Sequence, residues 1–204
     1  MKSAIKRSVP GLAIVMAAGL LAACSSEPMK TSADPVRPSQ VNANETYDQQ
    51  QMSREANDFL GDGAEGLANL MNKAFSDQGR PNAYIRGEEG GGAIIAGVRY
   101  GQGELVTKSG FKRKVYWQGP SLGFDFGANA GKVFILIYAL PDPDALFQRF
   151  AGVDGSAYVV GGASMNYARS GNIVVAPMRV GVGMRLGANI GYIHFTPTAS
   201  WNPF

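Results

Sequence analysis

Apolar residues recur at spacings of three and four along residues 47–76. The repeating positions are Met52, Ala56, Leu60, Ala64, Leu67, Met71 and Phe75. This spacing places them in one stripe on an α-helix. Gly61, Gly63 and Gly66 weaken the middle, so the pattern predicts one long helix that is kinked or divided in two. Acidic side chains dominate the polar face, and anionic lipid would repel them, which favours packing of the stripe against a protein core over a membrane-surface role.

From residue 83 onward the pattern changes to short runs of Val, Ile, Tyr and Phe among 21 glycines, which is typical of β-strands. Candidate strands span residues 83–88, 92–100, 103–109, 112–118, 121–127, 132–140, 155–161, 164–169, 172–179, 181–188 and 190–196. Turn signals between them are Gly101-Gln102, Ser109-Gly110, Asn129-Ala130-Gly131 and Ser170-Gly171. Because connections this short join antiparallel neighbours, the pattern predicts an antiparallel sheet. Glycine at alternate strand positions permits the curvature of a small barrel.

One strand and one interruption complete the predicted fold. The run at 132–140 is apolar on both faces, so we expect one face toward the barrel interior and the other toward the long helix. Asp142, Pro143 and Asp144 predict the start of a short helix of about two turns, with Arg149 near its end. The expected fold class is therefore α+β, mostly β: a small antiparallel β-barrel packed with one long N-terminal helix and one short helix.

The N-terminus reads as a secretory signal. Lys2, Lys6 and Arg7 precede an apolar run of about a dozen residues, which is too short to span a bilayer. Leu21-Ala22-Ala23-Cys24 resembles the lipobox of bacterial lipoproteins, in which the cysteine receives diacylglycerol before cleavage. We expect a signal peptide at 1–23, lipidated Cys24 and a disordered tether at 24–46, and a single domain at 47–204. The alternative is an ordinary signal peptide followed by a chance cysteine.

Residue 25 indicates the membrane to which the protein is anchored, and the net charge indicates which partners are expected. Ser25 stands where the common inner-membrane retention signal has Asp, which favours the outer membrane with the domain in the periplasm. The net charge of +3 is accounted for by the three basic residues of the signal, so the mature chain is formally neutral. We therefore expect no nucleic-acid partner. With a single cysteine in the chain, no intrachain disulfide can form.

The sequence predicts no catalytic residue, metal site or cofactor. His194 is the single histidine, which excludes a two-histidine metal site and makes a nucleophile-histidine pair unsupported. Gly87-Glu88-Glu89-Gly90 lacks the ending of a phosphate-binding loop, and we interpret its acids as a turn between strands. Paired acids for glycoside chemistry could come from Glu88, Glu89, Asp125, Asp142, Asp144 and Asp154, but Asp142 and Asp144 are better explained as helix caps. The protein is expected not to be an enzyme.

One basic segment is a candidate binding surface. Residues 80–204 contain 12 basic and 7 acidic side chains, and Lys112-Arg113-Lys114 is followed closely by Trp117. Cations beside interfacial aromatics suit an anionic membrane surface, so Lys112, Arg113, Lys114 and Trp117 are candidate lipid-binding or partner-binding residues. The alternative is a solvated hairpin end beside a buried Trp117.

Several sequence blocks resemble one family. The blocks are Val115–Gly127, Gly87–Gly90, Asp154–Tyr158, Gly187–Tyr192 and Trp201–Phe204. They resemble the envelope integrity protein A family of alphaproteobacteria, a domain of unknown function, from about Thr46 to Phe204. The resemblance implies a small periplasmic β-barrel with a packed helix and a role in cell-envelope integrity. It supplies no catalytic residue.

A weaker resemblance concerns the SYLF lipid-binding domain. The residues that resemble this domain are Ser121, Gly123, Gly127 and Ala128, the apolar strand 133–137 and Tyr167-Ala168-Arg169-Ser170. The expected function is that of a non-enzymatic envelope lipoprotein that binds phospholipid or an envelope partner. A scaffold that binds other envelope proteins or peptidoglycan is the alternative, and a hydrolase of an envelope component is the least favoured one.

Overall fold

The computed structural model describes residues 45–61, 65–93, 96–122, 131–180, 191–200 and 202. Its elements are α1 (Gln49–Leu60), α2 (Glu65–Gln78), β1 (Ala83–Ala93), β2 (Ala96–Thr107), β3 (Lys112–Leu122), β4 (Gly131–Tyr138), the 3-10 helix η2 (Pro143–Leu146), β5 (Arg149–Gly152), β6 (Tyr158–Val160), β7 (Ala163–Met165), β8 (Ala168–Ser170), β9 (Ile173–Val180) and β10 (Tyr192–Thr196). The predicted signal peptide, Cys24 and the predicted strand 181–188 lie outside the described residues. Of the predicted strand 121–127, the structure describes the first two residues.

Two helices form the N-terminal part of the described chain. The Oδ1 atom of Asp48 accepts a hydrogen bond from the amide of Gln51 at 2.8 Å, which caps the first turn of α1. α2 ends at Gln78, and the next residue is Gly79, whose φ of 78° is readily adopted by glycine and whose amide donates to the carbonyl of Phe75 at 3.0 Å. The division into α1 and α2 agrees with the second of the two helical alternatives that the stripe predicts.

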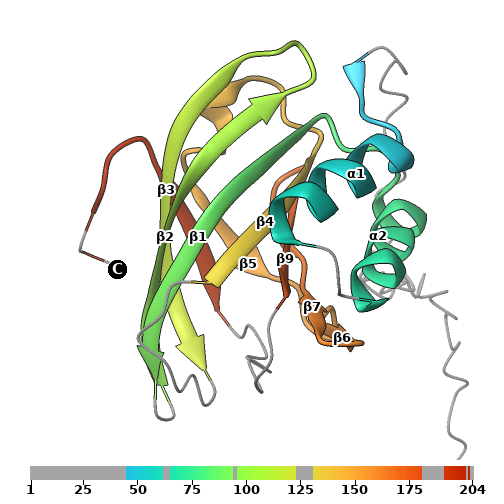
Figure 1. Ribbon diagram of the computed structural model, residues 1–204. Helices are drawn as coiled ribbons and strands as arrows, with labels where there is room; N and C mark the ends of the chain where they lie inside the picture. The colour runs from blue at the N-terminus through green and yellow to red at the C-terminus, as the bar shows by residue number, and fades with distance from the viewer. Residues whose placement is uncertain are drawn as a thin grey trace, which may run out of the picture. The chain divides into compact units, whose positions relative to one another are not determined.

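The apolar stripe of the helices packs against the outside of the sheet. Met52, Ala56, Leu67 and Met71 are buried, and they share a core with residues that point outward from β1, β4 and β9. Figure 1 shows both helices on one side of the barrel, where α1 lies beside β4. The predicted packing of this stripe against the protein core is confirmed.

Eight of the described strands form a closed antiparallel ring in the order β4-β1-β2-β3-β10-β5-β8-β9. Pairing of β9 with β4 closes the ring. β7 pairs with β9 beyond the end of β8, and β6 continues from β7 as a short hairpin. The mostly β barrel that the sequence predicts is therefore confirmed.

Two predicted turns are wrong because the first strands are longer than the sequence suggests. β2 runs without a break through Gly101 and Gln102, where a turn is predicted. β1 likewise continues through Glu88 and Glu89, which pair with Gln102 and Gly101. Glycine marks these positions because a side chain has no room there: a Cβ on Gly101 would lie 2.0 Å from Cε2 of Trp117. The turns at Ser109-Gly110 and Ser170-Gly171 join β2 to β3 and β8 to β9 as predicted.

β4 has two buried faces, as the sequence predicts. Phe134, Leu136 and Tyr138 point toward the helices, whereas Val133, Ile135 and Ile137 point into the barrel. At the described positions the barrel interior is filled by side chains from β1 to β5 and from β8 to β10. They include Ile85, Leu105, Val115, Trp117, Phe150, Val175, Ile193 and Phe195. The interior is therefore a packed core at these positions.

The segment after β4 differs in detail from the prediction. Asp142 caps η2 as expected, because its Oδ1 accepts hydrogen bonds from the amides of Asp144 and Ala145, both at 2.9 Å. η2 has four residues, whereas about two turns of helix are predicted. Arg149 belongs to β5 because its backbone pairs with β10. Tertiary pairing thus overrides the local helical signal after the first turn.

Replacement of Gly66 by alanine tests how closely α2 approaches the hairpin. Alanine is a better helix former than glycine, but its Cβ would lie 1.7 Å from the carbonyl oxygen of Val160. We expect Gly66→Ala to lower the free energy of unfolding by about 1–3 kcal/mol because backbone atoms must move. Urea unfolding measures this change.

The control for this test is Asn69→Ala, on the exposed face of the same helix. It should raise the free energy of unfolding by about 0.5 kcal/mol through helix propensity alone. An increase in stability for Gly66→Ala of the same size would contradict the close approach.

Candidate functional site

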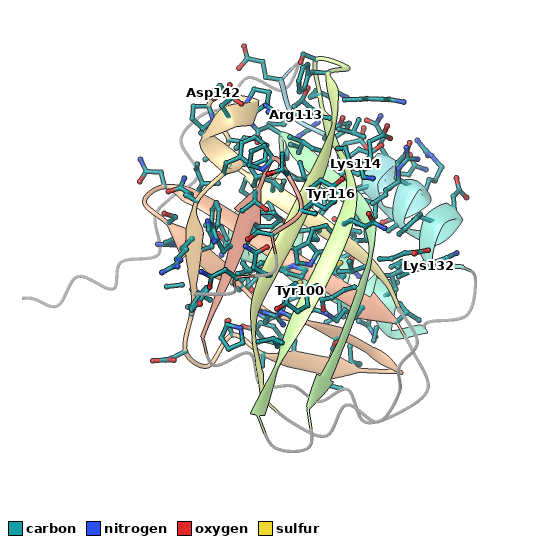
Figure 2. All side chains as sticks on the ribbon, turned by 90° about the vertical axis from the view of Figure 1, so that its left-hand side faces the viewer. Tyr100, Arg113, Lys114, Tyr116, Lys132 and Asp142 are labelled. Carbon is teal, nitrogen blue, oxygen red and sulfur yellow. The ribbon has the colours of Figure 1, made fainter. Side chains whose placement is uncertain are left out.

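The predicted basic residues of β3 occupy different environments. Lys112 and Lys114 are exposed, and Nζ of Lys114 lies 5.1 Å from the ring centroid of Tyr116. Arg113 is ion-paired with Asp144, and its guanidinium carbon lies 4.6 Å from the ring centroid of Phe147. Figure 2 shows Arg113, Lys114 and Tyr116 along β3. Two of the three cations are therefore without an ion pair among the described residues.

The structure does not bring Trp117 together with these cations. Alternate residues of a strand point to opposite faces, and Trp117 shares the inward face with Val115. Its side chain is 1% exposed. The aromatic residue beside Lys114 is Tyr116. The four candidate residues therefore lie as in the alternative interpretation, with the basic residues at a solvated hairpin end and Trp117 buried.

The outer face of β1, β2 and β3 contains two neighbouring hollows. The first has a volume of about 330 Å³ and lies between the strands and residues 199–200. Its lining includes Glu88, Tyr100, Gln102, Tyr116 and Gln118. The second, of about 400 Å³, extends toward Phe59 and Lys114 and shares Glu88 and Gln102 with the first. Figure 2 shows Tyr100 and Tyr116 on this face.

Charges around these hollows are largely balanced. Arg86 Nη2 donates to Glu104 Oε2 at 3.1 Å, and its Nη1 lies 3.7 Å from Glu55 Oε2. Lys132 Nζ donates to the carbonyl of Phe59 at 2.8 Å. The hollows therefore offer aromatic, amide and acidic groups without a continuous basic field.

A second polar cluster lies inside the barrel. Glu89 accepts two hydrogen bonds from Arg179, from Nε to Oε1 at 2.8 Å and from Nη2 to Oε2 at 3.1 Å. The indole Nε1 of Trp117 donates to Oε2 of Glu89 at 2.8 Å. Arg99 lies beside this carboxylate, with its Nε 3.8 Å from Oε2. These four residues form what we name the interior ion cluster.

Electrostatics keep the cluster ionised at neutral pH. Burial by itself raises the pKa of Glu89, but the charges of Arg179 and Arg99 and the hydrogen bonds from Arg179 and Trp117 lower the pKa to about 2. Burial lowers the pKa of Arg99 to about 10, while the charge of Glu89 opposes that change. The carboxylate of Glu89 and the guanidinium group of Arg99 are therefore both charged.

Sequence reasoning misses this cluster for two reasons. Glu89 stands in a glycine-rich stretch that resembles a turn, and Arg179 is 90 residues away in the chain. One feature of the sequence indicates the direction of Glu89, because it continues the inward, alternate positions occupied by Ile85 and Gly87. That alternation becomes informative only when β1 is known to extend past residue 88.

The other candidates for chemistry are dispersed. His194 lies on β10, and burial followed by the charge of Arg149 lowers its pKa. Asp142 and Asp144 belong to the cap of η2. Across the described ranges, no group of three or more His, Cys, Asp or Glu side chains is placed to hold a metal ion. In the same part of the chain, no helix has the length and apolarity needed to cross a bilayer.

The acid stability of the protein tests the interior ion cluster. Because the folded pKa of Glu89 lies near 2 and its ordinary value is 4.5, its ionisation stabilises the fold above about pH 4.5. This stabilisation is lost as pH falls from about 4.5 to 2. We expect Glu89→Gln to lower the free energy of unfolding by about 3–5 kcal/mol at pH 7, since two buried guanidinium groups lose their counterion.

Urea unfolding at a series of pH values measures this effect. The difference between the wild type and Glu89→Gln should shrink progressively below about pH 4.5. The exposed neighbour Glu88 supplies the control, Glu88→Gln, which should change stability little at any pH. A wild-type advantage over Glu89→Gln that stays constant down to pH 3 would refute the assigned pKa of Glu89.

Comparison with known proteins identifies relatives of this fold. A family model described as Envelope integrity protein A matches residues 45–204. A crystal structure of a beta-barrel-like, uncharacterised protein from Brucella abortus is 47% identical in sequence. The two structures superpose with a TM-score of 0.72, over 79% of this chain and 100% of that chain. A search of the curated proteins finds no match.

Proposed function

Because the chain belongs to the envelope integrity protein A family, we propose that it is a non-enzymatic lipoprotein that supports the bacterial cell envelope by binding another envelope component. The family's role in envelope integrity places the protein in the cell envelope. The proposal adds an anchor on Cys24 in the outer membrane, a periplasmic position for the barrel, and a binding surface on the outer face of β1, β2 and β3.

The observation that carries this proposal is the position of the open space. The barrel interior is packed with side chains at its described positions, while the two hollows of about 330 and 400 Å³ lie on the outer face. A ligand therefore meets the outer face first. Tyrosine rings beside amide side chains offer flat apolar surface and hydrogen-bonding groups together, which suits a polar polymer such as a peptidoglycan glycan strand.

The chemistry of the titratable residues supports binding over catalysis. A general acid or base works best with a pKa near the working pH and a free position for its proton. Glu89 has a pKa of about 2 and accepts three hydrogen bonds within the protein. It is therefore a structural counterion for Arg179 and a hydrogen-bond acceptor for Trp117.

Phospholipid binding is the second candidate, and Lys112 and Lys114 favour it. Both are exposed, and neither has an ion-pair partner among the described residues. Cations beside a tyrosine suit an anionic headgroup. Burial of Trp117 and pairing of Arg113 with Asp144 reduce this surface to two lysines and Tyr116, so we rank it second.

Sedimentation with purified peptidoglycan sacculi separates these two candidates. The probe is the soluble chain 25–204, which lacks the signal and Cys24. We expect it to sediment with sacculi, and Tyr100→Ala/Tyr116→Ala to weaken binding roughly tenfold or more because the aromatic surface of the hollow is removed. Lys112→Ala is the matched control and should sediment like the wild type, because Lys112 is on the same strand but lines neither hollow.

Flotation with phosphatidylglycerol vesicles provides the opposing measurement. Phospholipid binding predicts flotation that is lost in about 0.5 M salt and in Lys112→Ala/Lys114→Ala, with the tyrosine variant less affected. That result, together with no sedimentation on sacculi, would replace the glycan proposal by the phospholipid one. Failure in both assays would remove the outer face as a binding surface for either component.

The anchor requires its own test. We expect full-length protein in a Gram-negative host to incorporate labelled palmitate and fractionate with the outer membrane. Cys24→Ser should abolish incorporation and move the protein to the soluble periplasmic fraction or stall it with its signal attached, since the thiol is the acceptor. Ser26→Ala is the control and should behave as wild type. Outer-membrane fractionation of Cys24→Ser in high salt would show that the anchor lies elsewhere.

A further inference from the structure

The interior ion cluster contains more positive than negative charge. Glu89 is its one described carboxylate, whereas Arg99 and Arg179 are both cationic. The side chains of these three residues are between 10% and 17% exposed. A charge removed from water is stable only when an opposite charge and hydrogen-bond acceptors replace the water. One positive charge of this cluster is without such compensation among the described residues.

The uncompensated charge belongs to Arg99. Glu89 already accepts both hydrogen bonds of the Arg179 fork and one from Trp117. Its Oε2 lies 3.8 Å from Nε of Arg99, which exceeds hydrogen-bond length. In the described part of the chain, Nε and Nη2 of Arg99 are buried and have no hydrogen-bond partner, and the residue is 8% exposed.

The unpartnered atoms of this region are all donors. Nε and Nη2 form one edge of the guanidinium group, which matches two oxygens of a carboxylate or phosphate. Asn166 accepts a hydrogen bond on Oδ1 from Nη1 of Arg179 at 3.3 Å, and its own Nδ2 is buried without an acceptor. An anionic group with two or more oxygens supplies the acceptors and the charge that these donors lack.

The register of the strands places no side chain beside Arg99 on the two neighbouring strands, although on the Gly119 side the backbone of β10 is close, because a Cβ there would lie 2.2 Å from the carbonyl oxygen of Tyr192. On the inward face, its two cross-strand neighbours are Gly91 on β1 and Gly119 on β3. Neither neighbour has a side chain. In the adjacent layer the corresponding positions are taken by Glu89, Gly101 and Trp117. Arg99 therefore lies one layer beyond the carboxylate, between two positions where the side chain is only a hydrogen atom.

We propose that Arg99 binds a small oxyanion, or the phosphate of a lipid or polymer headgroup, at this end of the barrel interior. The Nε and Nη2 edge of Arg99 donates to two of its oxygens. Arg179 is held by Glu89 and raises the local positive potential without contacting the anion through its fork. This site is inside the barrel and independent of the binding surface on the outer face.

The first test measures thermal unfolding of the chain 25–204 with inorganic phosphate at constant ionic strength, balanced with chloride. We expect a saturable rise in the unfolding midpoint of about 3–6 °C at tenfold excess over the dissociation constant. Arg99→Leu should abolish the rise, and Arg99→Lys should weaken it because lysine keeps the charge without the two-donor edge. Arg86→Leu, on the outer face of β1, is the matched control and should respond as wild type.

Two results of that test would overturn the proposal. Wild-type protein that responds to phosphate no more than to chloride has no oxyanion site, and ordered water then satisfies Arg99. A folded Arg99→Leu protein that keeps the full phosphate response binds the anion elsewhere.

A second measurement does not depend on the folding of an Arg99 variant. The chain contains two tryptophans, so Trp201→Phe leaves Trp117 as the sole indole. Because Trp117 donates to Glu89 within the cluster, phosphate binding should change its emission with the same saturation curve as the thermal shift. Absence of any emission change at saturating phosphate would also overturn the proposal.

Glycerophosphoglycerol distinguishes the two sources of the anionic group. A diester that shifts the unfolding midpoint as phosphate does supports a headgroup ligand, because its phosphate carries substituents on two oxygens. A response to phosphate alone supports a free oxyanion.

Discussion

The architecture depends on β4, which is buried on both faces and paired on both edges. One edge pairs with β1 and the other with β9, so this strand both continues the sheet and closes the ring. Its outward side chains pack against the helices, and its inward side chains fill the barrel. From Val133 to Tyr138 every side chain is buried, the inward ones because side chains fill a barrel of eight strands and the outward ones because the helices cover that face.

The interior ion cluster follows from the placement of one large side chain. The indole of Trp117 occupies space that side chains on Gly87 and Gly101 would otherwise fill. A buried indole N–H needs an acceptor, which Glu89 provides, and a buried carboxylate needs a cation, which Arg179 provides. Trp117 thus requires Glu89, and Glu89 requires Arg179. The glycines of β1 and β2 leave the space that the indole occupies.

The sequence predicts most of the fold because its periodicities are local. The stripe containing Met52 and Met71 and the doubly apolar run of β4 are visible without knowledge of neighbours. Gly101-Gln102 is misread as a turn because a glycine required by Trp117 from the next strand looks the same in sequence as a glycine required by a turn. The residue that distinguishes a strand glycine from a turn glycine here is Trp117 on β3, which is not a sequence neighbour of Gly101.

The site is less predictable than the fold. Exposed Lys112 and Lys114 were identifiable from their charge, but the inward direction of Trp117 depends on the parity of β3. The partnership of Glu89 with Arg179 spans 90 residues and depends on β9 reaching β4. Contacts of this kind are set by closure of the ring, and no spacing in the chain indicates them.

Closure also determines when the barrel can form. β10 pairs with both β3 and β5, so residues 192–196 complete a ring that begins at residue 83. Folding must therefore bring together segments from opposite ends of the domain, which gives a high contact order and slow folding compared with helical domains. Synthesis delivers the N-terminus first, so one edge of β3 stays open until β10, the last strand of the ring, has been made. The time spent in that state, during which a chaperone or an aggregate competes for the same edge, is a consequence of topology alone.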